Sequence, residues 1–276
     1  MPKGFEFCCI LKFVAKHDRT APAVSATGPL NEVLQWSVRQ QALYHTIDLP
    51  GKTKHTTTIL VNPSICLWNS IKAEFGASRP ALKKATSWAT IPTLIFESLT
   101  VNWGDYVGSL HRAVELLKLD AQSTNPSRPN IGETNTSSLN TALEVMDRLQ
   151  TASHVLESNI RTILEIRREA ESSPAPWDSF EKFGEKLRFL CCAEEVAREL
   201  EFQQGHVRSI ISRLEAVTMM VRDLINVRNT LTMERMTART IREAYTMRVI
   251  ALLTLCFLPP TFIAARDFST WITLKS

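Results

Sequence analysis

The stretch that decides the fold of this chain is Met247-Arg-Val-Ile-Ala-Leu-Leu-Thr-Leu-Cys-Phe-Leu-Pro-Pro-Thr-Phe-Ile-Ala-Ala265, its most apolar run. The run has no charged side chain from Val249 to Ala265, a span of 17 residues. As a helix rising about 1.5 Å per residue, this span covers roughly 26 Å. The hydrocarbon core of a bilayer is about 30 Å thick. Length alone is therefore compatible with a membrane-spanning helix and with a buried core helix.

A very long helix is predicted directly before this run. Gly205 is the last glycine of the chain, and neither Gly nor Pro occurs between it and Pro259. A helix over 207–258 would be about 78 Å long, which no compact domain of this size needs. Its first half has a heptad seam, a pattern that predicts helix packing or self-association. The seam consists of Val207, Ile210, Leu214, Val217, Val221 and Leu224.

Composition excludes several functions. The chain has 276 residues, of which 44% are hydrophobic and 22% charged, as in an ordinary folded protein. Its net charge is only +4, and it has no basic patch interleaved with aromatics, so we expect no nucleic-acid binding. The six cysteines lack Cys-x-x-Cys spacing and the six histidines are scattered, so we predict no cofactor and name no metal ligands. Without a phosphate loop, nucleophile elbow or paired metal ligands, an enzyme is not expected.

Residues 1–120 are predicted to form a small α/β region. The apolar stretch 5–14 indicates a strand, and the runs 43–49 and 56–61, separated by Pro50-Gly51, indicate a hairpin or two neighbouring strands. A short helix is expected over 63–76. A single longer helix is expected from Pro92, because seven apolar residues recur at steps of three and four. They are Phe96, Leu99, Trp103, Tyr106, Leu110, Val114 and Leu117.

The rest of the chain is predicted to be helical apart from a linker and a tail. The Ser/Thr/Asn-rich segment 121–138 indicates a flexible linker. Region 139–202 is expected to hold a helix over 139–170 and, after prolines 174 and 176 and an N-cap at Asp178, a further helix. The first helix would face Leu139, Leu143, Met146, Leu149, Leu156, Ile160 and Ile163 inward, and the next would carry Phe180, Phe183, Leu187 and Leu190.

The fold class predicted is mainly α, with a long stalk helix (203–248) that runs into a single transmembrane helix (249–265) and a polar tail (266–276). A core helix should keep a polar face, yet the only polar side chains in the apolar run are Thr254, Thr261 and the weakly polar Cys256. Arg248 and Arg266 would reach the two membrane interfaces. Arginines before the run would keep the bulk of the chain on the cytoplasmic or an equivalent side. A hydrophobic tail packed against a partner protein remains the alternative.

At these residues the sequence resembles the CorA metal-ion transporter superfamily, in particular its divergent fungal branch. The resemblance is carried by Phe257-Leu-Pro-Pro-Thr-Phe-Ile-Ala264, with weaker support from Trp36-Ser-Val-Arg-Gln, Tyr44-His45 and Asn102-Trp103-x-x-Tyr106. It implies a homopentamer in a lipid membrane, with a cytosolic α/β domain and a pore for hydrated divalent cations, chiefly Mg²⁺. The positions that match pore-lining residues are Met247, Ile250, Leu258 and Thr261, and the helix-kink motif matches Pro259, Pro260 and Phe262.

The sequence departs from the family pattern after the motif. Phe268-Ser269-Thr270 stands where the family has a Gly-Met-Asn signature, and residues 266–276 contain no second transmembrane helix. Both departures put transport by this chain in question. Two interpretations remain open. The chain is either a pore-forming subunit of a CorA-like transporter in shortened form, or a non-transporting helical scaffold or regulatory protein that oligomerises through its long helix.

Overall fold

The computed structural model describes residues 5–17, 30–48, 55–76, 88–123, 132–172 and 180–273. It contains two compact units, one of residues 1–124 with 132–221 and one of residues 125–131 with 222–276. The described residues are mainly helical, with a small sheet near the N-terminus and one very long helix. These features confirm the coarse fold class predicted from the sequence.

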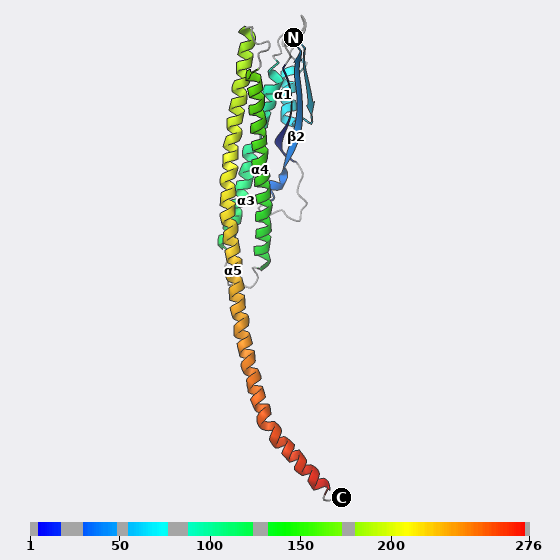
Figure 1. The fold of residues 1–276 in the computed structure, drawn as a ribbon, viewed down its shortest axis with the longest axis vertical. Helices are drawn as coiled ribbons and strands as arrows, with labels where there is room; N and C mark the ends of the chain where they lie inside the picture. Colours follow the sequence, from blue (N-terminus) through cyan, green and yellow to red (C-terminus); the bar gives the residue numbers. More distant parts are fainter. Residues whose placement is uncertain are drawn as a thin grey trace. The chain divides into compact units, whose positions relative to one another are not determined.

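The sheet has three antiparallel strands in the order β1-β2-β3 (Figure 1). Strand β1 (Phe5–Lys16) pairs with β2 (Trp36–Asp48), and β2 pairs with β3 (His55–Val61). A 3-10 turn, η2 (Val33–Gln35), leads into β2. Alternate side chains point to the core because successive residues of a strand face opposite sides. Cys9, Leu11 and Phe13 are buried on β1, and Leu43 opposite Cys9 is buried on β2.

The strands predicted over 5–14 and 56–61 are confirmed as β1 and β3. The run predicted over 43–49 is only the second half of β2, which begins at Trp36, and residues 49–54 lie outside the described part. Helix α1 (Ile65–Phe75) likewise matches the short helix expected over 63–76. Its N-cap is Ser64, whose hydroxyl accepts a hydrogen bond from the Leu67 N–H at 3.1 Å. A side-chain oxygen at this position satisfies one of the four free N–H groups of the first turn.

The prediction of a single helix from Pro92 is wrong. The segment forms two helices, α2 (Thr90–Thr100) and α3 (Trp103–Ser123). The chain breaks at Asn102, whose φ of 71° lies in the left-handed region that ends helices. The Asn102 side-chain amide donates to the Val14 carbonyl at 3.2 Å, which fixes the corner against β1. All seven predicted apolar residues are nevertheless buried.

Helix α4 (Gly132–Ser172) begins well before the predicted Leu139, so it occupies part of the segment expected to be a linker. Residues 124–131 lie outside the described part. Leu143 is 52% exposed, against prediction. The buried residues follow three-four spacing from Ala142, one position before Leu143, so Leu143 falls on another side of the helix. The buried face begins with Ala142, Val145, Leu149, Ala152 and Leu156.

Helix α5 (Phe180–Thr273) is continuous where separate helical segments were predicted. Gly205 does not interrupt it, since a mid-helix glycine costs only about 1 kcal/mol. The helical bounds also include Pro259 and Pro260. Among the apolar residues predicted for its first turns, Leu187 is exposed. The side chains of Phe180 and Phe183 lie outside the described part. The predicted N-cap, Asp178, lies outside it entirely.

In the first unit, α5 runs antiparallel to α4. Arg167 pairs with Glu194 at 3.4 Å, and the Gln204 amide donates to the Ser153 carbonyl at 3.4 Å. The part of the heptad seam from Val207 to Val221 is buried inside this chain. These seam residues therefore form intrachain core packing, and they are not free to join two copies of the chain.

Candidate membrane-facing site on helix α5

Several polar side chains of the α5 segment 222–246 bond to groups of the same helix. Threonine hydroxyls donate to carbonyls one turn earlier, as in Thr230 to Asn226 at 3.1 Å and Thr246 to Arg242 at 2.8 Å. Arg239 pairs with Glu243 at 3.6 Å, an i,i+4 spacing that places both on one face. These side chains are exposed, so they form a polar surface on this part of the helix.

The next segment, residues 247–256, is apolar apart from Arg248 and Thr254, and each of its residues is exposed in the chain. Met247 is 70% exposed, Ile250 50% and Leu255 71%, and all ten residues of the segment are exposed. The Thr254 hydroxyl donates a hydrogen bond to the Ala251 carbonyl at 2.9 Å, so its donor is satisfied within the helix. Contiguous apolar surface of this kind marks contact with a membrane or with another protein.

The residues predicted to line a pore share one stripe of α5. At about 100° per residue, positions 247, 250, 258 and 261 fall within roughly 80° of one another. Met247 and Ile250 are exposed on this stripe. The side chains of residues 257–264 lie outside the described part, so the placements of Leu258, Thr261 and the motif residues Pro259, Pro260 and Phe262 are known only through the helical backbone.

No helix in the described ranges is both long enough and apolar enough to cross a membrane. In the same part of the chain, no three His, Cys, Asp or Glu side chains lie together as metal ligands.

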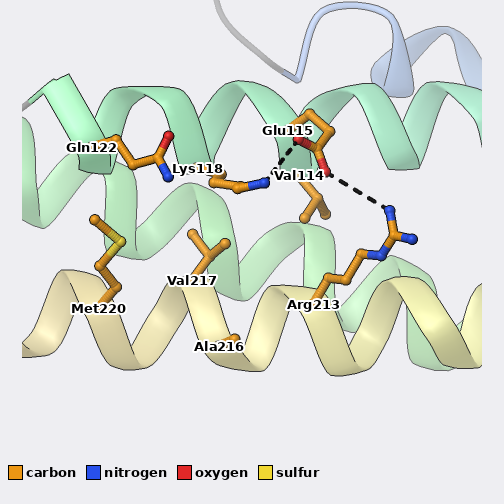
Figure 2. Close-up of a pocket in the computed structure, with 8 residues that line it drawn as sticks. All are labelled: Val114, Glu115, Lys118, Gln122, Arg213, Ala216, Val217 and Met220. Atoms are coloured by element: carbon orange, nitrogen blue, oxygen red, sulfur yellow. Dashed lines mark hydrogen bonds and ion pairs between the residues drawn. The ribbon is translucent and has the colours of Figure 1, made fainter.

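A charged groove between α3 and α5 is a second candidate site (Figure 2). It encloses about 340 Å³. Glu115 lines it from α3 and pairs with Lys118 at 3.5 Å and with Arg213 at 3.9 Å. Arg213 also contacts His111 Nε2 at 3.0 Å. The apolar floor consists of Val114, Ala216, Val217 and Met220.

Each charged group lining this groove already has an opposite charge beside it. An incoming ligand would have to displace Glu115 from two cations, or the cations from Glu115. We therefore interpret the groove as the contact that joins α3 to α5. Sequence reasoning missed it, because residues about 100 positions apart in the chain give no local signal.

A buried histidine was also missed. His45 is fully buried, and its Nδ1 lies 2.8 Å from the Thr58 hydroxyl. Its ring stands 5.4 Å from Phe7 and 6.5 Å from Trp88. Burial lowers the pKa of His45 from 6.5 to about 4, because the charged imidazolium would lose its hydration. The alternation of the strand was the available signal, since residue 45 follows buried positions 41 and 43.

Neither a protein-family model nor a curated protein matches the sequence.

Proposed function

We propose that this chain is a membrane-inserted, CorA-like subunit related to divalent-cation transport, and that α5 carries residues 249–265 into the bilayer. The observation that supports the proposal is the course of α5, one helix that begins in the folded first unit and continues through the apolar run. The exposed Val249, Ile250, Leu252, Leu253 and Leu255 would together gain on the order of 10 kcal/mol by leaving water.

Transport of a hydrated cation is the finer part of the proposal. The stripe of Met247, Ile250, Leu258 and Thr261 would face a pore formed by several copies of the chain. Mg²⁺ gives up its water reluctantly, so threonine hydroxyls and main-chain carbonyls suit its hydration shell. Rings of Met, Ile and Leu would close such a pore by excluding water. Because Phe268-Ser269-Thr270 lacks the Gly-Met-Asn pattern, we expect transport by this chain to be weak.

A non-transporting oligomeric scaffold is the second candidate function. Exposed apolar residues upstream of the run favour it, because they offer a helix-packing surface to further copies. They are Val227, Met233, Met236 and Ile241. Such association would use this part of α5 and not the buried seam from Val207 to Val221.

Alkaline carbonate extraction of membranes from cells that express the full chain tests the insertion. We expect the chain to stay in the membrane pellet. Leu255→Arg should raise the fraction recovered in the supernatant, because a centrally placed arginine costs about 3 kcal/mol and so weakens insertion. Met233→Arg is the matched control in the polar segment and should stay in the pellet. Recovery of the unmodified chain in the supernatant would refute the proposal.

Ion flux separates the two candidates. The purified chain is placed in liposomes that contain a Mg²⁺-sensitive dye, and empty liposomes serve as the reference. Mg²⁺ entry above that reference, altered by Thr261→Ala, supports a transporting subunit. Stable insertion without entry favours the scaffold.

A further inference from the structure

A basic pocket lies in the first unit, where the end of β1 and the start of β2 meet the start of α1. It encloses about 500 Å³, within the range of small-molecule sites. Three basic residues line it, Lys16, His17 and Arg39. None of the described residues that line it is acidic. We name this cavity the β1–α1 pocket, and it is separate from α5 and from the groove of Figure 2.

Arg39 is held in place at the mouth of this pocket. Its Nε donates to the Ser37 hydroxyl at 3.4 Å, and its Nη2 lies 3.0 Å from His17 Nδ1. A guanidinium has five N–H donors, so these two contacts leave three for a ligand. Among the described residues, no carboxylate forms an ion pair with Arg39 or Lys16. Within the described part of the chain, Arg39 and Lys16 therefore have no carboxylate beside them of the kind that Glu115 provides in the groove.

Further donors come from the first turn of α1. Ser64 Oγ accepts from the Leu67 N–H, and the first N–H groups of a helix have no partner inside it. Ile65 and Cys66, which carry these groups, line the pocket, and so does Asn69 one turn later. A helix N-terminus also carries partial positive charge. Side-chain and main-chain donors thus line one cavity, and none of its described lining residues carries a negative charge.

We propose that the β1–α1 pocket binds an oxyanion of the phosphate class, carried as the phosphate monoester of a small metabolite. A phosphate offers several acceptor oxygens, and a guanidinium can hold two of them at once. The pocket is many times the roughly 30 Å³ share of one water molecule, so it has room for more than the anion. Val14, Ile65 and Val101 give it apolar walls against which the rest of such a ligand would pack.

Isothermal titration of the full chain with inorganic phosphate and with adenosine monophosphate tests this proposal. Adenosine without phosphate is the negative arm. We expect saturable binding of the monophosphate that weakens as salt is raised, because the contact is between charges. Equal affinity for inorganic phosphate would show that the site recognises the anion alone. That result would support the oxyanion site and refute the assignment of a metabolite as its ligand. Failure of both phosphates to bind would overturn the proposal.

Two substitutions locate the site. Arg39→Gln should weaken monophosphate binding roughly tenfold or more, since charge-assisted hydrogen bonds are lost. Arg161→Gln removes the same charge from an exposed position on α4 and should change nothing. Lys16→Gln is the second variant if Arg39→Gln folds poorly, because Lys16 is exposed and its ammonium lies over the Trp36 ring, 5.8 Å from the ring centroid. Equal affinities of Arg39→Gln, Lys16→Gln and Arg161→Gln would refute the assignment.

Discussion

Asn159 on α4 binds both main-chain polar groups of Lys12 on β1. Its amide donates to the Lys12 carbonyl at 2.6 Å, and its side-chain oxygen accepts from the Lys12 N–H at 3.0 Å. Strand β1 is at the edge of the sheet, where such groups have no neighbouring strand. Only 1% of Asn159 is exposed, so its amide is buried between α4 and β1. One side chain therefore completes the edge of the sheet and joins it to the helices.

Removing this contact should destabilise the first unit. Asn159→Ala leaves two main-chain groups of Lys12 without partners, at a cost of about 1–3 kcal/mol each. We expect a loss of roughly 2–4 kcal/mol in urea denaturation. Asn140→Ala, an exposed position on the same helix, is the control and should stay within about 0.5 kcal/mol. Equal losses in the two variants would show that the contact does not carry this stability.

The buried His45 should make stability depend on pH. Its folded-state pKa is about 4 and its ordinary value is 6.5, so the unfolded chain takes up the proton first. The stability is therefore fully present above pH 6.5 and decreases as the pH falls towards 4. The loss should be about 3 kcal/mol, at 1.36 kcal/mol per pKa unit.

Unfolding measured between pH 4 and 7 checks this expectation. His45→Leu should flatten the dependence in that window, because it removes the titrating group. His154→Gln, at an exposed position on α4, should leave the slope as it is. Identical slopes for the unmodified chain and His45→Leu would contradict the prediction.

The corner between α2 and α3 should tolerate glycine better than a branched residue. Asn102 adopts φ 71°, which β-branched side chains rarely reach. Asn102→Val should therefore lower the free energy of unfolding more than Asn102→Gly, by about 1–2 kcal/mol, as measured by urea denaturation. Both variants lose the hydrogen bond to Val14, so the difference between them measures the free-energy cost of the left-handed backbone conformation at residue 102. A smaller loss for the valine variant would mean that the corner changes conformation.

The seam of α5 should behave as core and not as an oligomer interface. Val217→Ala removes buried apolar volume and should cost about 1–2 kcal/mol. Glu115→Gln breaks ion pairs that are partly exposed, so its loss should be below about 1 kcal/mol and should shrink in salt. The Val217→Ala loss should not vary with protein concentration. A loss that grows on dilution would assign the seam to self-association.

Local pattern determined which segments of this chain form which elements. Three-four spacing predicted the helices that bury Phe96, Leu110 and Leu149, and the absence of Gly and Pro predicted most of α5. These signals are readable because helix formation depends on residues one turn apart. The apolar run after Met247 is likewise a property of composition alone.

Tertiary structure decided what each buried face packs against. The seam from Val207 to Val221 could serve one chain or several, and only the fold shows that it closes on its own chain. The break at Asn102, the exposed face of Leu143 and the burial of His45 also depend on neighbours far away in sequence. Periodicity predicts which face of an element is buried, but it does not identify the element that covers this face. That depends on contacts such as the one between Asn159 and Lys12, which are 147 residues apart.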